Sequence, residues 1–182
     1  MRTFRTLVVL RQPVGAVWTT MRDRLPELVP MIDDVDQITT LEREELTDDR
    51  TRLVNEWQVR QRIPELLRGA LPQGELGWID RNIWDDDSHL CTWQIEPFVL
   101  PGAIRCEGST SYESAMAGRG CRVLFEGSFD LSDDALSALA APLRRPATRF
   151  VETIVTTLIP RNTRSLLEAA AQRASEDAGE PG

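Results

Sequence analysis

The chain has 182 residues, with 21 basic and 29 acidic side chains and a formal net charge of −8. That length suits one domain, which we place at residues 1–174. The acidic balance disfavours a nucleic-acid partner, because no basic stripe interrupts it. All basic residues are arginine, which excludes reactions that need a lysine nucleophile.

No apolar run approaches the roughly 20 residues that a membrane-spanning helix needs. The apolar residues 7–10 are too few, and too close to arginine, for the core of a signal peptide. We therefore expect a cytoplasmic protein without stable membrane insertion. Cys91, Cys106 and Cys121 are widely spaced and form no CxxC motif, which favours buried, reduced thiols.

Strand-like segments dominate the first three quarters of the chain. An apolar, β-branched stretch predicts a strand at residues 3–10. Pro13 then occupies the tolerated first turn of a helix, and a second short helix is expected at residues 25–31. Alternating patterns predict six more strands, at residues 36–46, 51–62, 76–84, 89–96, 104–115 and 121–131.

A single long helix is expected last, at residues 147–173. Pro160 should kink or break it, because proline removes a helical hydrogen bond. The small and polar residues 175–182 are expected to be disordered. One apolar stripe of the helix carries Val151, Ile154, Val155, Leu158, Leu166, Leu167 and Ala170.

The last two strands are expected to pair through a turn at residues 118–119. Tyr112 would then oppose Phe125, and Gly108 would oppose Phe129. One face of this hairpin is polar, so the other should be buried. The predicted buried face carries Cys106, Gly108, Thr110, Tyr112, Met116, Cys121, Val123, Phe125 and Phe129.

A second hairpin is expected to turn at residues 86–87. It would pair Trp84 with His89 and Asn82 with Cys91. Three of the five tryptophans then share one face with three polar side chains. That face holds Trp78, Asp80, Asn82, Trp84, His89 and Trp93.

Polar groups on an aromatic face admit two interpretations. A buried carboxylate without partners is costly and shifts its pKa upward. Asp80 and Asn82 therefore either lie near the wet end of the strand or face out, or they orient a hydroxyl or carbonyl of a ligand. Trp57 should also point inward, whereas the pattern of residues 36–46 leaves the facing of that strand open.

The connections between strands alternate in character. Residues 47–50, 85–88 and 117–120 form short polar turns, whereas the loops at 63–72 and 97–102 are apolar and contain proline and glycine. Alternate connections of a meander lie at the same end of the sheet, so one end should be apolar and form the mouth of a pocket. We expect a mobile lid there, formed by Leu66, Leu67, Leu71, Phe98, Val99 and Leu100.

The element order, together with the segment Pro-Val-x-x-Val-Trp from Pro13 to Trp18, resembles the START/polyketide-cyclase superfamily, which has the helix-grip fold. The resemblance covers nearly the whole chain. It implies an α+β fold in which a curved antiparallel sheet of about seven strands grips the long C-terminal helix, with two short helices after the first strand. It also implies a ligand cavity between sheet and helix. Members bind lipids, sterols, polyketides, hormones or quinones, and some are cyclases or partner-regulating modules.

No catalytic motif of that superfamily matches particular residues. His89 is the single histidine, and its neighbour Ser88 would face the opposite side of an extended strand. His89, Cys91 and Asp80 are a weak candidate for a metal site, because His-x-Cys lacks the usual zinc spacing. We expect neither a metal nor a cofactor.

The leading hypothesis is therefore binding or transport of a small hydrophobic molecule, such as a lipid, polyketide or quinone, in an internal cavity. Gly108, Thr110 and Gly127 are small where a filled core needs bulk, which predicts a cavity of roughly 300–1,000 Å³. One alternative is a cyclase, dehydratase or hydrolase that uses Asp80, His89 or Tyr112 as acid or base. Another is a protein-interaction module with a filled cavity. The predicted ligand-binding residues are Trp57, Trp78, Asp80, Asn82, Trp84, His89, Trp93, Tyr112, Phe125, Val151 and Ile154.

Overall fold

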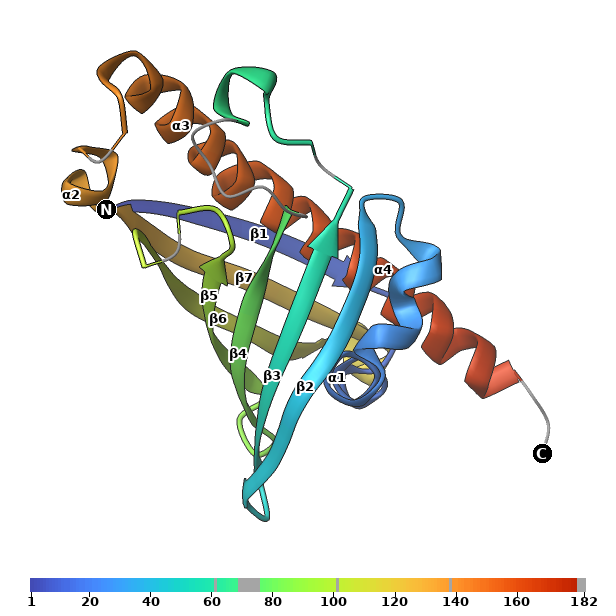
Figure 1. The fold of residues 1–182 in the computed structure, drawn as a ribbon. Helices are drawn as coiled ribbons and strands as arrows, with labels where there is room; N and C mark the ends of the chain where they lie inside the picture. The colour runs from blue at the N-terminus through green and yellow to red at the C-terminus, as the bar shows by residue number, and fades with distance from the viewer. Residues whose placement is uncertain (61, 69–75, 101, 138, 180–182) are drawn as a thin grey trace.

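The computed structural model describes residues 1–60, 62–68, 76–100, 102–137 and 139–179 (Figure 1). Its centre is a seven-stranded antiparallel sheet in the order β1-β7-β6-β5-β4-β3-β2. The sheet curves, and the C-terminal helices cross it (Figure 1), which confirms the predicted α+β fold. The strands are β1 (Arg2–Leu10), β2 (Val35–Thr47), β3 (Arg50–Val59), β4 (Leu76–Asp85), β5 (Leu90–Pro97), β6 (Ile104–Ala115) and β7 (Gly120–Leu131).

The helices lie where the sequence places them, with short additions in the loops. The first helix buries Val17, Trp18 and Met21. No helix among the described residues is both long and apolar enough to cross a membrane. The helical elements are α1 (Val14–Asp23), η1 (Leu25–Met31), η2 (Glu65–Leu67), η3 (Met116–Gly118), α2 (Asp133–Ser137), α3 (Ala141–Thr153), η4 (Ile154–Leu158) and α4 (Ile159–Gly179).

The last helix is longer than predicted and has a different irregularity. It begins at Ala141, and the five-residue π-helical turn η4 ends two residues before Pro160. In that turn the Ile159 N–H donates to the Ile154 carbonyl, five residues back. Such a turn is a common way to absorb a break in the regular hydrogen-bond ladder. The helical conformation therefore continues from α3 through the π turn into α4 without a break in the chain direction that a loop would give.

The predicted disordered tail differs from the structure. α4 extends to Gly179, so residues 175–179 are helical, whereas residues 180–182 lie outside the described part of the chain. Arg24 forms an ion pair with Asp177 at 2.5 Å between Nη1 and Oδ2, which fastens this end of α4 to the start of η1. A polar composition alone did not reveal this tertiary contact.

Both predicted hairpin registers are wrong by two residues. Tyr112 pairs with Val123, and Trp84 pairs with Cys91. The cause is turn length: η3 occupies the β6–β7 connection, and the β4–β5 connection includes His89 in a left-handed conformation with φ 48°. A shift of two preserves facing. The predicted buried face is therefore correct except at Met116, which lies in the turn and is 49% exposed.

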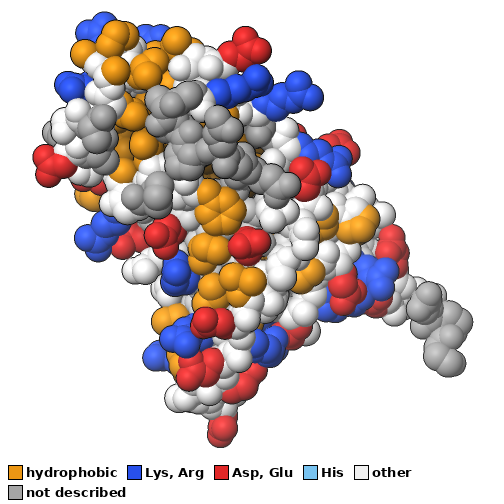
Figure 2. All heavy atoms as spheres, in the orientation of Figure 1, with side chains coloured by type: hydrophobic (Ala, Val, Ile, Leu, Met, Phe, Trp, Pro, Cys, Tyr) orange, Lys and Arg blue, Asp and Glu red, His pale blue; other side chains and the backbone are white. Residues whose placement is uncertain are grey.

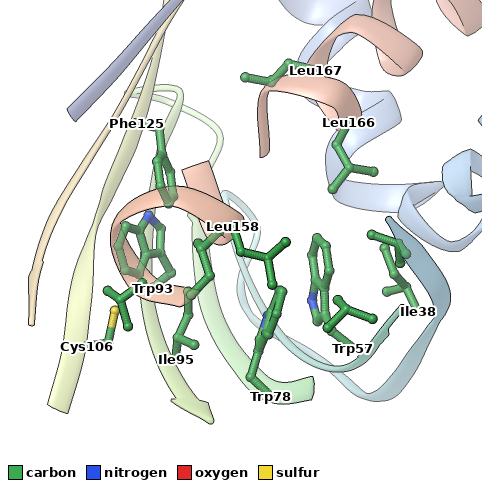
Figure 3. Close-up of a cluster of buried hydrophobic side chains, with 14 of the residues drawn as sticks. Ile38, Trp57, Trp78, Trp93, Ile95, Cys106, Phe125, Leu158, Leu166 and Leu167 are labelled. Atoms are coloured by element: carbon green, nitrogen blue, oxygen red, sulfur yellow. The ribbon is translucent and has the colours of Figure 1, made fainter. Parts of the chain in front are cut away.

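The tryptophans form the centre of the core (Figure 3). The Trp93 ring stacks on Phe125 with centroids 4.8 Å apart, and Trp57 stacks on Trp78 at 5.3 Å. The small residues of β6 and β7 do not leave the expected void, because Trp93 occupies the space above them. A Cβ on Gly108 would lie 2.5 Å from the Trp93 ring, and one on Gly127 would lie 2.4 Å from it.

Replacement of Gly108 by alanine should therefore destabilise the protein. The new Cβ would lie 2.2 Å from the backbone oxygen of Glu126 as well as against Trp93, so both strand and ring must move. Overpacking of this kind lowers the free energy of unfolding by about 1–3 kcal/mol. Gly15→Ala is the control, since no atom lies within 4 Å of its added Cβ and alanine favours helix. Thermal unfolding that is equal in the two variants would contradict this packing.

Candidate functional site

An interior cavity lies between the curved sheet and α4. Its volume is about 60 Å³. Alternate residues of β4 point into it because strand side chains alternate between faces. Its lining comprises Met21, Leu25, Trp57, Trp78, Asp80, Asn82, Trp84, Cys91, Trp93, Ile95, Thr110, Tyr112, Phe125, Ile159, Thr163 and Leu166.

The predicted large internal cavity is therefore wrong. At about 30 Å³ per molecule, this space holds about two waters, and it is too small for a lipid or a polyketide. The aromatic rings that were expected to wall a cavity instead fill most of it, as the stacked pairs in Figure 3 show.

Eight of the predicted ligand-binding residues line this cavity, and three do not. His89 and Val151 are absent from its lining, and Ile154 lines a different space described below. Sequence reasoning missed the α4 side chains Ile159, Thr163 and Leu166. Their spacing of four and three residues is the helical signal that identifies them. Ligand binding by any of these residues stays a prediction.

Asp80 is the unusual group of the interior. Its side chain is 8% exposed, so the interpretation that it faces out is wrong. Asn82 donates from Nδ2 to Asp80 Oδ2 at 2.9 Å. Burial raises the pKa of Asp80 from 3.8 to about 6, against the opposing effect of the Asn82 hydrogen bond. The Trp57 indole N–H also favours the ionised carboxyl, although it does not meet hydrogen-bond geometry.

The other polar groups of the cavity wall stay neutral near pH 7. Burial raises the pKa of Tyr112 and that of the Cys91 thiol well above their ordinary values. Trp93 donates from Nε1 to Thr110 Oγ1 at 3.1 Å. Among described residues, the buried Nε1 atoms of Trp57 and Trp84 have no hydrogen-bond partner. Asp80 is thus the group of this wall that titrates in the neutral range.

The cysteines are free and buried, as predicted. Burial raises the pKa of Cys106 to about 12 and that of Cys121 to about 11, so both are protonated thiols. The part of the chain that the structure describes holds no group of three His, Cys, Asp or Glu side chains arranged for a metal ion. His89, Cys91 and Asp80, the weak candidate for a metal site, are accordingly not arranged around a common point.

His89 lies at the polar end of the sheet. Its ring meets Trp18 edge to face, with centroids 5.2 Å apart. Trp18 in turn donates from Nε1 to Asp86 Oδ1 at 2.6 Å, and Arg22 forms an ion pair with the same carboxylate. These contacts link the β4–β5 turn to α1. They give His89 a structural environment outside the cavity.

A larger groove runs along the outer side of α3 and η4. Its volume is about 780 Å³. Around the start of α3, hydrophobic and arginine side chains lie close together on the molecular surface (Figure 2). The described lining comprises Pro64, Pro142, Arg145, Pro146, Arg149, Phe150, Thr153, Ile154, Thr157, Leu158 and Arg161.

The predicted lid residues have mixed positions. Leu66 is 63% exposed, whereas Leu67 is 1% exposed and belongs to the core, as does Val99. Phe98 and Leu100 are half-buried. Leu67 and Val99 are therefore core residues in this structure, and the role of the other residues as a mobile lid stays a prediction. Leu71, predicted in the same loop, lies outside the described residues.

Asp80→Asn should change stability in a pH-dependent way. In the wild type, the raised pKa means that the carboxyl is protonated in both states below about pH 4 and ionised in both above about pH 6. Its burial therefore destabilises the fold only as pH rises through that window, by about 3 kcal/mol at most. The stability gain of Asp80→Asn, measured by urea unfolding, should grow from pH 4 to 6 and then level off.

The control for that measurement is the exposed Asp87→Asn. It makes the same change of charge on the surface, away from the interior cavity. A gain for Asp80→Asn that does not vary with pH would refute the raised pKa.

Neither a protein-family model nor a curated protein sequence matches the chain. Solved structures do. TTHA0849 from Thermus thermophilus shares 19% identity at a TM-score of 0.64, covering 98% of this chain and 100% of that one. Zhui aromatase/cyclase from Streptomyces sp. R1128 shares 16% at 0.64, covering 99% of each chain.

A point mutant of norcoclaurine synthase from Thalictrum flavum shares 11% identity at a TM-score of 0.60, covering 98% of this chain and 96% of that one. These matches span the whole architecture, including the long last helix and the short helices after β1. The chain therefore has the helix-grip fold of START and polyketide-cyclase proteins.

Proposed function

We propose that the protein binds a small hydrophobic molecule in the groove along α3 and η4. The observation that carries this proposal is the groove's size. Its volume of about 780 Å³ falls within the roughly 300–1,000 Å³ of typical ligand sites. The interior cavity, at about 60 Å³, serves as the deep end of the site.

Leu158 connects the two spaces. It lines the groove, and it also belongs to the buried cluster that contains Trp78 and Ile95 (Figure 3). The next residue, Ile159, lines the interior cavity. We infer that the π turn carries the partition between groove and cavity, and that a change of the Leu158 rotamer lets the tip of a ligand reach the polar wall at Asp80.

The solved structures support a role with small molecules. Two proteins of the same fold, Zhui aromatase/cyclase and norcoclaurine synthase, are enzymes by name. Both a carrier and an enzyme must bind a small molecule, so binding is the more general of the functions considered for this chain. The groove geometry alone favours binding.

An acid–base enzyme is the second candidate, and Asp80 favours it. A carboxyl with a pKa of about 6 at a cavity wall is suited to proton transfer near neutral pH. Deuterium exchange into an apolar ketone such as 2-tetralone, followed by NMR, separates the candidates. Exchange that the wild type accelerates and Asp80→Asn abolishes would favour the enzyme, whereas binding without exchange favours the carrier.

Thr157→Trp should block the groove. Thr157 is exposed on η4 and lines the groove, so a tryptophan there fills ligand space without entering the core. We expect the affinity for the neutral fluorescent probe N-phenyl-1-naphthylamine to fall more than about tenfold, or 1.4 kcal/mol.

Thr156→Trp is the matched control for that variant. Thr156 is its exposed neighbour but does not line the groove, so its affinity should stay within about twofold of the wild type. Equal probe binding in both variants would place the site elsewhere. If the wild type itself binds no apolar probe, the interaction-module hypothesis becomes the better one.

Leu158→Ala should join the groove to the interior cavity. If one further methylene of a ligand is then buried, affinity should rise about fourfold, because such a group contributes about 0.8 kcal/mol. Leu166→Ala is the control, since Leu166 is equally buried and lines the cavity but not the groove. Both variants should lower the melting temperature, and only the first should tighten binding of a long apolar ligand. If both variants bound the long apolar ligand more tightly, Leu158 would not be the partition between groove and cavity.

A further inference from the structure

We propose that the ligand of the groove is an amphiphile with an anionic head, and that Arg145 and Arg149 hold that head. This inference rests on the proposed binding function and adds the chemical class of the ligand. It requires an apolar floor, a cationic end and a direction from one to the other. The described residues of the groove provide all three.

The charge of the groove is opposite to that of the chain. The protein carries 29 acidic against 21 basic residues, yet the described lining includes three arginines and no carboxylate. The hydrophobic side chains of Phe150, Ile154 and Leu158 share this lining. A neutral apolar ligand would form no charge-assisted hydrogen bond with the arginines. A cationic ligand would be repelled by them.

Arg145 and Arg149 are available for a ligand. They form no ion pair with any described residue, whereas Arg161 is paired with Asp34 at 2.6 Å between Nη2 and Oδ2. Both are exposed. Because they stand four residues apart on α3, they share one helix face and can approach the same group. Guanidinium groups bind carboxylate and phosphate oxygens in forked geometry.

The groove also has a direction. Arg145 lies in the second turn of α3, and Arg149 lies one turn further on. Ile154 and Leu158 follow toward η4. At about 1.5 Å rise per residue, the nine steps from Arg149 to Leu158 span about 14 Å. An acyl chain of medium length laid along this line has its head at the arginines and its tail at the Leu158 partition.

A displacement experiment tests the proposal on the full chain. N-phenyl-1-naphthylamine is bound first and then displaced by dodecanoate, by dodecyl phosphate or by 1-dodecanol, each below its aggregation concentration. In the wild type, the two anions should bind about tenfold more tightly than the alcohol, because two exposed charged contacts add only modestly to affinity. The preference of one anion over the other distinguishes carboxylate from phosphate as the natural head.

The variant Arg145→Gln/Arg149→Gln should lose the preference for anions and keep its affinity for the alcohol within about twofold. Arg119→Gln is the control. Arg119 is exposed at the opposite end of the sheet, beside η3, and forms no ion pair with a described residue, so its removal makes half of the charge change of the double variant, away from the groove. That variant should keep the preference. High salt should weaken the preference in the wild type through screening.

Three outcomes would overturn the inference. Equal affinity of the wild type for the alcohol and both anions would leave hydrophobic binding intact but remove the head-group site. The same conclusion follows if the double variant weakens all three ligands equally, or if Arg119→Gln loses the preference as well. Failure of the wild type to bind the probe or any amphiphile would instead reject the proposed function, and the inference with it.

Discussion

The packing of one helical stripe against the concave face of the sheet determines the rest of this structure. Val151, Val155 and Leu158 are nearly fully buried, and Leu166 and Leu167 continue the stripe beyond Pro160. Large aromatic side chains of the sheet pack against this stripe, and little space remains between helix and sheet. The main hydrophobic stabilisation and the limit on internal volume therefore have the same origin.

The same packing explains why groove and interior differ so much in chemistry. Inside, the packing leaves room for only about two waters, so burial raises the pKa of the Asp80 carboxyl and keeps the buried thiols protonated. Outside, the opposite side of α3 is wet and carries arginines next to apolar side chains. Phe150, Ile154 and Leu158 line the groove and also belong to the buried core, and Leu158 directly precedes Ile159 of the cavity wall.

The sequence predicted which face of the sheet a side chain lies on, but it did not predict which residues pair across neighbouring strands. The period-two pattern put Trp78, Asp80, Asn82 and Trp84 on one face, and the structure buries all four. The pattern alone left open whether Asp80 and Asn82 are buried. Pairing depends on turn geometry instead, and the left-handed residue His89 gave no sequence signal strong enough to set it. Because both errors were even-numbered shifts, the composition of the core survived them.

Volume was harder still to infer. Gly108 and Gly127 were taken as a sign of empty space, yet they are directly paired and their missing side chains admit the Trp93 ring. A small residue marks close approach as often as a void. The groove escaped sequence reasoning because it forms between α3 and a loop that is distant along the chain, whose Pro64 contributes to its lining. The arginines were visible in the sequence, but nothing there showed that they face a common space.

The free edge of the sheet at β2 has a consequence for the behaviour of the protein at high concentration. β2 pairs with β3 on one side only, its register shifts at three places, and its last eight residues, 40–47, are exposed. Glu42, Glu44 and Glu45 stand on this segment. Bulges and charged side chains on an edge strand disfavour the addition of a strand from a second molecule, which is how natural proteins guard an open sheet against polymerisation. The chain can thus keep an open, curved sheet without closing it into a barrel.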